Sequence, residues 1–358
     1  MAVPAITNGT EHFGVVTWTG NNSSPRAITG VGHQPDFIWI KDRIAANNHV
    51  LVDTSKGLST LLYSNANVAG VTGATQVSSS NSDGFTLGAT TYVNESGSSN
   101  TYVAWNWKAN GGTTASSTNS TVQVNSTAKF SIVQYNGTGS DQTIGHGLGV
   151  KPDAIWIKNV VQNSATGSGV AWRNWQKDII SLSGDANTYY RFDSDDSHTA
   201  GGDSWGDTAP TSSVFTVGAD VHTNASVSGG TAQYIAYCFA NVDGFFKTGR
   251  YVGNSSTDGT MVNTGFKPAL VMIKAYNLGV SWYMFDNKRN SFNPSGKRLV
   301  ADGTFVEDAG TTEALDFLSN GFKLRNTSAG TNGGYTYTYY AWAENPFVGD
   351  GTNPVTAR

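Results

Sequence analysis

The sequence predicts an all-β protein made of three tandem antiparallel β-sandwich domains of the jelly-roll or lectin-like kind. Short stretches such as "FGVVTWTG" and "DFIWIK" alternate or run apolar between Gly, Asn, Ser and Asp, which is typical of β-strands. The strand signature occurs three times along the 358-residue chain. Convincing helical periodicity is absent, so parallel β-α-β units are not expected.

The composition supports many short strands joined by polar turns. Charged residues make up 13% of the chain, against a usual value of about 25%, and Gly alone accounts for 42 residues. The net charge is -4 and there is no block of Lys and Arg, so nucleic-acid binding is not expected. No apolar run approaches the roughly 18 residues of a membrane helix, so membrane insertion is not expected either.

The repeat is clearest in a ten-residue motif that begins at Gly32 and reads "GHQPDFIWIK". It recurs as "GVKPDAIWIK" from Gly149 and as "GFKPALVMIK" from Gly265, at offsets of 117 and 116 residues. A Phe, an aromatic residue and a Gly precede each copy, and 17 residues separate the aromatic from the Pro every time. The signature residues are Phe13, Trp18, Gly20, Pro35 and Trp39, then Phe130, Tyr135, Gly137, Pro152 and Trp156, then Phe246, Tyr251, Gly253 and Pro268.

Each copy also ends alike, which sets the domain boundaries. The closing runs 102–105, 234–237 and 339–342 read "YVAW", "YIAY" and "YYAW". We therefore predict β-sandwich domains at 1–112, 128–243 and 244–349, a flexible Gly/Ser/Thr/Asn-rich linker at 113–127 and a C-terminal tail at 350–358. Repeats of this size are expected to have their own cores.

The strand residues are interpreted as structural. Trp39 and Trp156 are expected to fill a core or the space between sheets, because Met272 replaces them in the third copy. The lysines that end the motif, Lys41, Lys158 and Lys274, are expected to mark the solvent-facing or edge end of a strand.

The sequence offers only weak candidates for metal-binding or catalytic residues. Asp193, Asp195 and Asp196 form an acidic loop that offers oxygen ligands for Ca²⁺, but the loop lacks the Glu and the spacing of an EF-hand, and a solvated loop is the simpler interpretation. The six His show no zinc-binding spacing, and no Glu recurs at the same repeat position. We therefore predict no catalytic residues, no metal site, no cofactor and no enzymatic activity.

The motif G-x-x-P-D-x-[IV]-W-I-K, with a later D-G-F-T-L-G and a closing Y-V-A-W, resembles a domain of uncharacterised function found, often in tandem, in structural proteins of marine bacteriophages. The resemblance is closest in the first copy and weakest in the third, where Ala269, Leu270 and Met272 depart from the pattern. It implies a virion component, often labelled as tail fibre or lectin-like, and it transfers no catalytic residues.

The organisation favours the head of the virion over the tail. The first repeat begins near residue 12 without heptads for a trimerising shaft, and three similar domains suit a local threefold position on a capsid. We therefore expect a capsid decoration, or cement, protein that is assembled into virions in the host cytoplasm and contacts the major capsid protein or other virion proteins. The alternative is a tail-fibre or receptor-binding protein with lectin-like recognition of host surface glycans.

Overall fold

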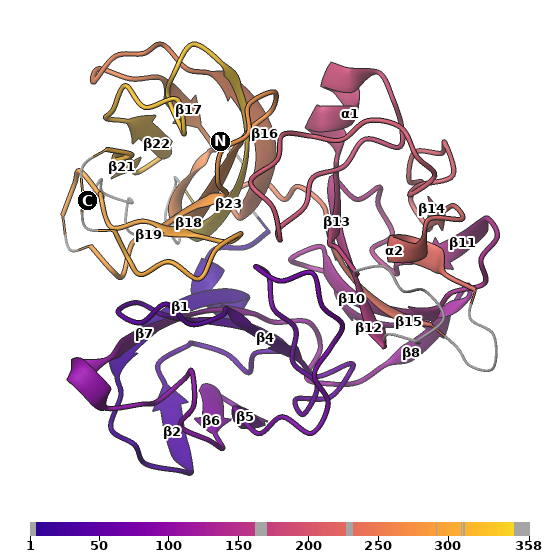
Figure 1. The fold of residues 1–358 in the computed structure, drawn as a ribbon, viewed down its shortest axis with the longest axis horizontal. Helices are drawn as coiled ribbons and strands as arrows, with labels where there is room; N and C mark the ends of the chain where they lie inside the picture. Colours follow the sequence, from indigo (N-terminus) through magenta and orange to yellow (C-terminus); the bar gives the residue numbers. More distant parts are fainter. Residues whose placement is uncertain are drawn as a thin grey trace.

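The computed structural model describes residues 5–161, 170–226, 232–290, 292–308, 310 and 312–346. Its regular structure is almost entirely antiparallel β-strand arranged in packed sheets, which confirms the predicted all-β sandwich fold. Three units surround a common centre (Figure 1). We call the described parts of 5–112, 113–243 and 244–346 the first, second and third units.

Each unit has one large sheet with the same strand order. In the first unit it contains β1 (Phe13–Thr19), β7 (Thr101–Trp107), β3 (Phe37–Asp42) and β4 (Val50–Asp53). In the second unit the matching strands are β10 (Phe130–Asn136), β15 (Gln233–Phe239), β12 (Ala154–Val161) and β13 (Arg173–Gln176). In the third unit they are β16 (Phe246–Val252), β23 (Thr336–Pro346), β18 (Phe266–Ala275) and β19 (Tyr283–Asp286), with β20 (Leu299–Val300) beyond.

A small sheet packs on the outer side of each large sheet (Figure 1). The small sheets are β2 (Arg26–Thr29), β6 (Gly84–Leu87) and β5 (Val77–Asn81); β11 (Gln142–Gly145) and β14 (Val214–Val217); and β17 (Met261–Asn263), β22 (Gly321–Leu324) and β21 (Leu315–Leu318). The helices are short: α1 (Lys177–Ser183), α2 (Val221–Asn224) and the 3-10 turns η1 (Gly9–Glu11) and η2 (Gly97–Ser99). No helix among the described residues is long and apolar enough to cross a membrane.

Strand register shows which residues of the units correspond. Trp18 pairs with Tyr102, Tyr135 with Tyr234, and Tyr251 with Tyr337. In the third unit, residues 337–340 therefore correspond to the closing runs 102–105 and 234–237 of the other two units. The predicted match at 339–342 is wrong by two residues. The strand is rich in Tyr at alternate positions, so the sequence pattern alone allowed both registers.

The predicted linker at 113–127 is also not a linker. Most of it forms β8 (Ala115–Ser117) and β9 (Ser120–Asn125), and β9 pairs with β10 along its length. The large sheet of the second unit therefore has six strands. The Ser, Thr and Asn content of residues 113–127 suggested a flexible segment. Pairing with β10 instead satisfies the backbone groups of β9 that water would otherwise solvate.

The cores are both local and shared. The first and second units each have an apolar cluster between their large and small sheets, as predicted. The core of the third unit is continuous with a central cluster to which all three large sheets contribute. Near the start of the chain, Gly9 lies against the backbone of Ala343 and Glu344 in β23, which joins the first unit to the third.

Candidate functional site

The signature aromatics build the same local packing in each unit. Trp18 stacks on Tyr102 at 5.5 Å, Tyr135 on Tyr234 at 5.2 Å and Tyr251 on Tyr337 at 5.1 Å between ring centroids. Each donates a side-chain hydrogen bond to a backbone carbonyl, that of Val93, Thr223 or Thr331. These residues are buried, so they stabilise the sandwich and are not presented to a ligand.

The signature glycines lie where the chain has no room for a side chain. A Cβ on Gly20 would lie 1.9 Å from the carbonyl oxygen of Glu95. On Gly137 and Gly253 it would lie 2.4 Å and 2.0 Å from carbonyl oxygens of Ala225 and Gly333. The neighbouring atoms are backbone and cannot move aside as a side chain would.

The tryptophans of the motif meet at the centre of the molecule. Trp39 and Trp156 are fully buried, and their ring centroids are 6.4 Å apart although they belong to different units. Trp156 also contacts Trp342 of the third unit at 6.0 Å. The prediction that these residues fill a core is confirmed, and that core lies between the units. The signature phenylalanines Phe13, Phe130 and Phe246 and the prolines Pro35, Pro152 and Pro268 are buried as well.

The prediction that the motif lysines face solvent is wrong. Lys41, Lys158 and Lys274 are all fully buried. Each ammonium group donates a hydrogen bond within its own unit, to the carbonyl of Ala45, Val170 or Val280, and Lys41 donates another to that of Asp42. A further bond goes to a carbonyl of a neighbouring unit, that of Thr304, Ala66 or Asp195. The first unit thus binds the third, the second binds the first, and the third binds the second.

A second set of hydrogen bonds runs around the centre in the same sense. Trp172 Nε1 donates to the carbonyl of Tyr63, and Trp282 Nε1 donates to the carbonyl of Arg191. His49 occupies the corresponding position in the first unit, just before β4. Its Nδ1 accepts from Trp39 Nε1 at 2.8 Å, so its Nε2 carries the proton and donates to the carbonyl of Val300 at 2.9 Å. Burial lowers the pKa of His49 well below its usual value, which keeps it neutral.

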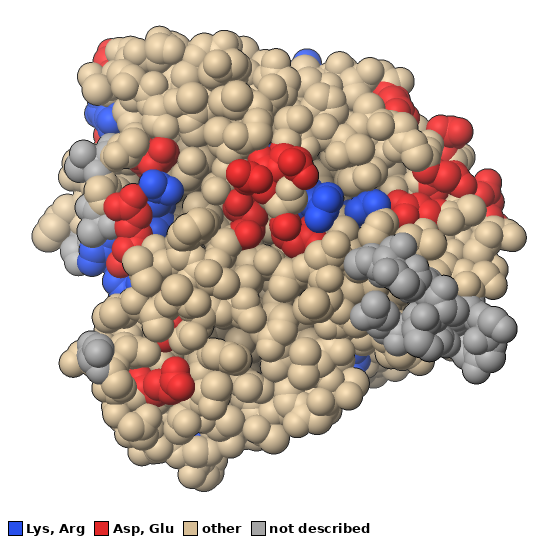
Figure 2. Space-filling model, viewed as in Figure 1, with Lys and Arg blue, Asp and Glu red and all other residues tan. Residues whose placement is uncertain are grey.

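Ion pairs reinforce the contact between the first and third units. Arg43 binds Glu307 through two hydrogen bonds of 2.8 Å, and Glu307 also pairs with Arg289 at 3.1 Å. Trp105 Nε1 of the first unit donates to Asp286 of the third at 3.2 Å. Elsewhere the face viewed in Figure 2 is mostly uncharged, with acidic side chains gathered near its centre.

The acidic loop does not form a ligand cage. Asp193 pairs with Arg191 at 3.1 Å, and Asp196 accepts a hydrogen bond from Ser194. Asp195 contributes its backbone carbonyl to Lys274. Within the described ranges, no group of three or more His, Cys, Asp or Glu side chains is placed to hold a metal ion. Cys238 is buried in β15, and burial raises the pKa of its thiol far above the usual range.

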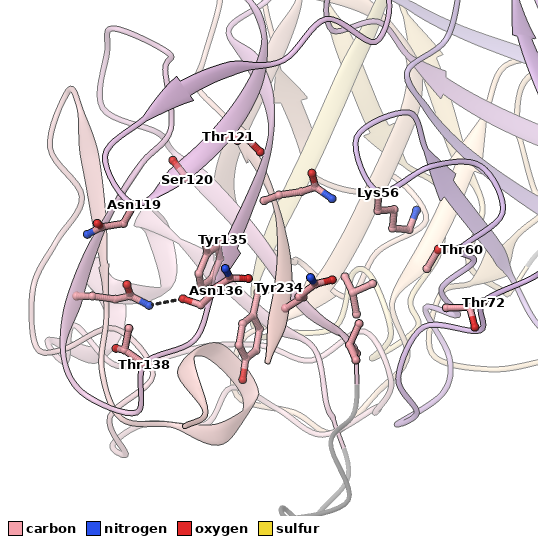
Figure 3. A pocket seen from close by; sticks show the side chains of 15 residues that line it. Lys56, Thr60, Thr72, Asn119, Ser120, Thr121, Tyr135, Asn136, Thr138 and Tyr234 are labelled. Atoms are coloured by element: carbon pink, nitrogen blue, oxygen red, sulfur yellow. Dashed lines mark hydrogen bonds between the residues drawn. The ribbon is translucent and has the colours of Figure 1, made fainter. Parts of the chain in front are cut away.

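An open groove of about 660 Å³ lies between the second unit and a loop of the first (Figure 3). Its second-unit side is formed by the ends of β9, β10, β12 and β15 and by the start of β11. The lining side chains are Lys56, Thr60 and Thr72 from the first unit, and Asn119, Ser120, Thr121, Gln134, Tyr135, Asn136, Thr138, Gln142, Val160, Val161, Gln233 and Tyr234 from the second.

The groove exists because the face of the second-unit sheet changes character along its strands. Ile132 and Ile235 are buried in the central cluster, whereas Gln134, Asn136 and Gln233 lie farther along the same face and reach solvent. Gln123 of β9 joins this sheet to the first unit by donating to Thr54 and Ser55, at 3.0 and 2.7 Å. Sequence reasoning missed this site because one wall is the segment interpreted as a linker.

Comparison with known proteins adds a family but no activity. No curated protein matches the chain significantly. A family model described as a domain of unknown function, DUF7483, matches residues 8–346. The matched region covers all three units, so the family's domain corresponds to the whole three-unit body described above. The chain belongs to this family, the domain of unknown function DUF7483.

Proposed function

We propose that the protein is a structural component of a bacteriophage virion, namely a decoration protein that binds the head surface and stabilises contacts between capsomers. The observation that carries the proposal is the cyclic set of cross-unit hydrogen bonds from Lys41, Lys158 and Lys274. A chain that closes three equivalent units around one centre presents related surfaces about a pseudo-threefold axis. Such a body suits a capsid position where three subunits meet.

Two further features support attachment to a large partner. The body is held together internally by buried bonds, so little ordering of its core is needed on binding. In the third unit, the aromatic side chain of Phe292 is 79% exposed and that of Phe305 is 66% exposed. Exposed aromatics are suitable anchors for a protein interface, with the major capsid protein or another virion protein as the partner.

The test is the location and copy number of the chain in purified virions, measured by cryo-EM and quantitative mass spectrometry. We expect head-surface density and a copy number that matches a class of positions in the capsid lattice. Density at the tail tip alone would instead support the alternative, a tail-fibre or receptor-binding protein that recognises host glycans. Absence from the particle would contradict both.

A further inference from the structure

Three amide side chains in the groove have no hydrogen-bond partner among the residues that the structure describes. Those of Gln134, Asn136 and Gln233 make no side-chain hydrogen bond within the described chain, although neighbouring amides such as Gln142 and Asn119 are bonded to the backbone. Each free amide offers two donor hydrogens and an acceptor oxygen. The three lie on adjacent strands, since Gln233 pairs with Asn136 and Gln134 lies two residues before it.

The groove carries almost no net charge. None of its described lining residues is Asp or Glu. The one cation among the described lining residues, Lys56, is paired with Asp53 at 2.7 Å, with both side chains buried. An ionic ligand would therefore lose its hydration without gaining a counter-charge, whereas a neutral polar ligand would lose little.

The walls provide hydroxyl groups and a small apolar surface. Thr60 and Thr72 of the first unit lie across the groove from Asn119, Ser120 and Thr121 (Figure 3). Val161 is part of the lining and is exposed on the rim. The rings of Tyr135 and Tyr234 are buried and their hydroxyls are bonded to backbone carbonyls, so they do not offer a stacking platform.

We infer that this groove is a binding site for a neutral oligosaccharide. Sugar hydroxyls both donate and accept, which matches a set of unpartnered amides and threonine hydroxyls, and the C–H face of a sugar ring fits beside Val161. The volume lies within the roughly 300–1,000 Å³ range of small-molecule sites. Because no carboxylate lines the described groove, the site binds without hydrolysing a glycosidic bond.

The site is particular to the second unit. The positions of Gln134 and Gln233 are occupied by Thr17 and Thr101 in the first unit, as the strand registers show. The first unit also has no counterpart of the β8–β9 hairpin on the outer edge of its described large sheet. The inference rests on the residues of this groove alone, and it is independent of the proposed position of the protein in a virion.

These correspondences define the test. In the full-length chain, Gln134→Thr and Gln233→Thr install residues that the same strand positions carry in the first unit, so the fold is expected to be retained. Thr17→Ala alters the position in the first unit that corresponds to Gln134 and serves as the matched control. The probe is an array of neutral and sialylated oligosaccharides, followed by saturation-transfer NMR and calorimetric titration of the neutral sugars that bind.

We expect a neutral oligosaccharide to bind, and the double variant to weaken it at least about tenfold through loss of one or two hydrogen bonds. Thr17→Ala should leave the affinity unchanged, and all variants should melt within a degree or two of the wild type. The inference would be overturned by binding that is unaffected in the double variant, by selective binding of sialylated sugars, or by no neutral sugar binding at millimolar concentration.

Discussion

At the scale of single residues, the motif lysines show how a buried side chain can join two units by donating hydrogen bonds to backbone carbonyls. Lys41 satisfies its three donor positions with the carbonyls of Asp42, Ala45 and Thr304. Because these partners are neutral carbonyls, desolvation dominates and lowers the pKa of Lys158 to about 7 and the pKa values of Lys41 and Lys274 to about 8.

This burial predicts an unusual dependence of stability on pH. In the unfolded chain these lysines keep their protons up to about pH 10.5, whereas in the folded chain they lose them from about pH 7 to 8. Between these values the unfolded state binds more protons, so the free energy of unfolding should rise with pH. Urea denaturation between pH 7 and 9 should show this rise, and Lys158→Met should reduce the slope by about 1 kcal/mol per pH unit. An equal slope in the two proteins would contradict the assignment.

The signature glycines allow a second prediction at this scale. Gly20→Ala forces a Cβ against the carbonyl of Glu95, so we expect a loss of about 3 kcal/mol or more in the free energy of unfolding. Gly97 is the control, because a Cβ there would meet nothing within 4 Å. Gly97→Ala should change stability by less than about 0.5 kcal/mol in the same denaturation experiment. If the two changes reduced the free energy of unfolding equally, the close approach of the Glu95 carbonyl would not be what excludes a side chain at position 20.

At the scale of elements, the sequence predicted those features that depend on residues close together in the chain, namely the strands and their correspondence between the repeats. Trp39 and its neighbours in β3 read as a strand because they form an apolar run between turn residues, and the repeat supplied the register of the corresponding strands. The groove and the inter-unit bonds depend on partners distant in sequence. Lys41 and Thr304 are 263 residues apart, and no local pattern indicates that pairing.

The second element at issue is β9, where composition and local pattern disagree. The segment is rich in Ser, Thr and Asn, but Val122 and Val124 alternate with polar residues, which is a weak strand signal. Because β9 pairs with β10 over its whole length, its amides should exchange with solvent deuterium far more slowly than those of an unstructured linker. Hydrogen exchange followed by mass spectrometry on the peptide spanning 120–125 measures this. Exchange as fast as in a denatured control would restore the linker interpretation.

At the scale of the whole molecule, the three units share one central core. Trp156, for example, contacts rings of all three units: Trp39 of the first at 6.4 Å, Phe239 of its own at 4.6 Å and Tyr340 of the third at 5.4 Å. Separating any unit would expose this cluster to water and break the lysine and indole hydrogen bonds around it. The units therefore repeat like tandem domains along the chain but pack like the subunits of a trimer.

This packing predicts that the protein unfolds as one body. Differential scanning calorimetry of the full chain should show a single transition, although its length would allow independent domains. Trp156→Ala removes a ring from the shared core and should cost about 3–5 kcal/mol, which lowers that transition without dividing it. Phe85→Ala is the informative comparison, because Phe85 lies in the separate core of the first unit. If the units are coupled through the central core, Phe85→Ala also lowers the temperature of the single transition. A separate transition of the first unit in this variant would show that the central core does not couple the units.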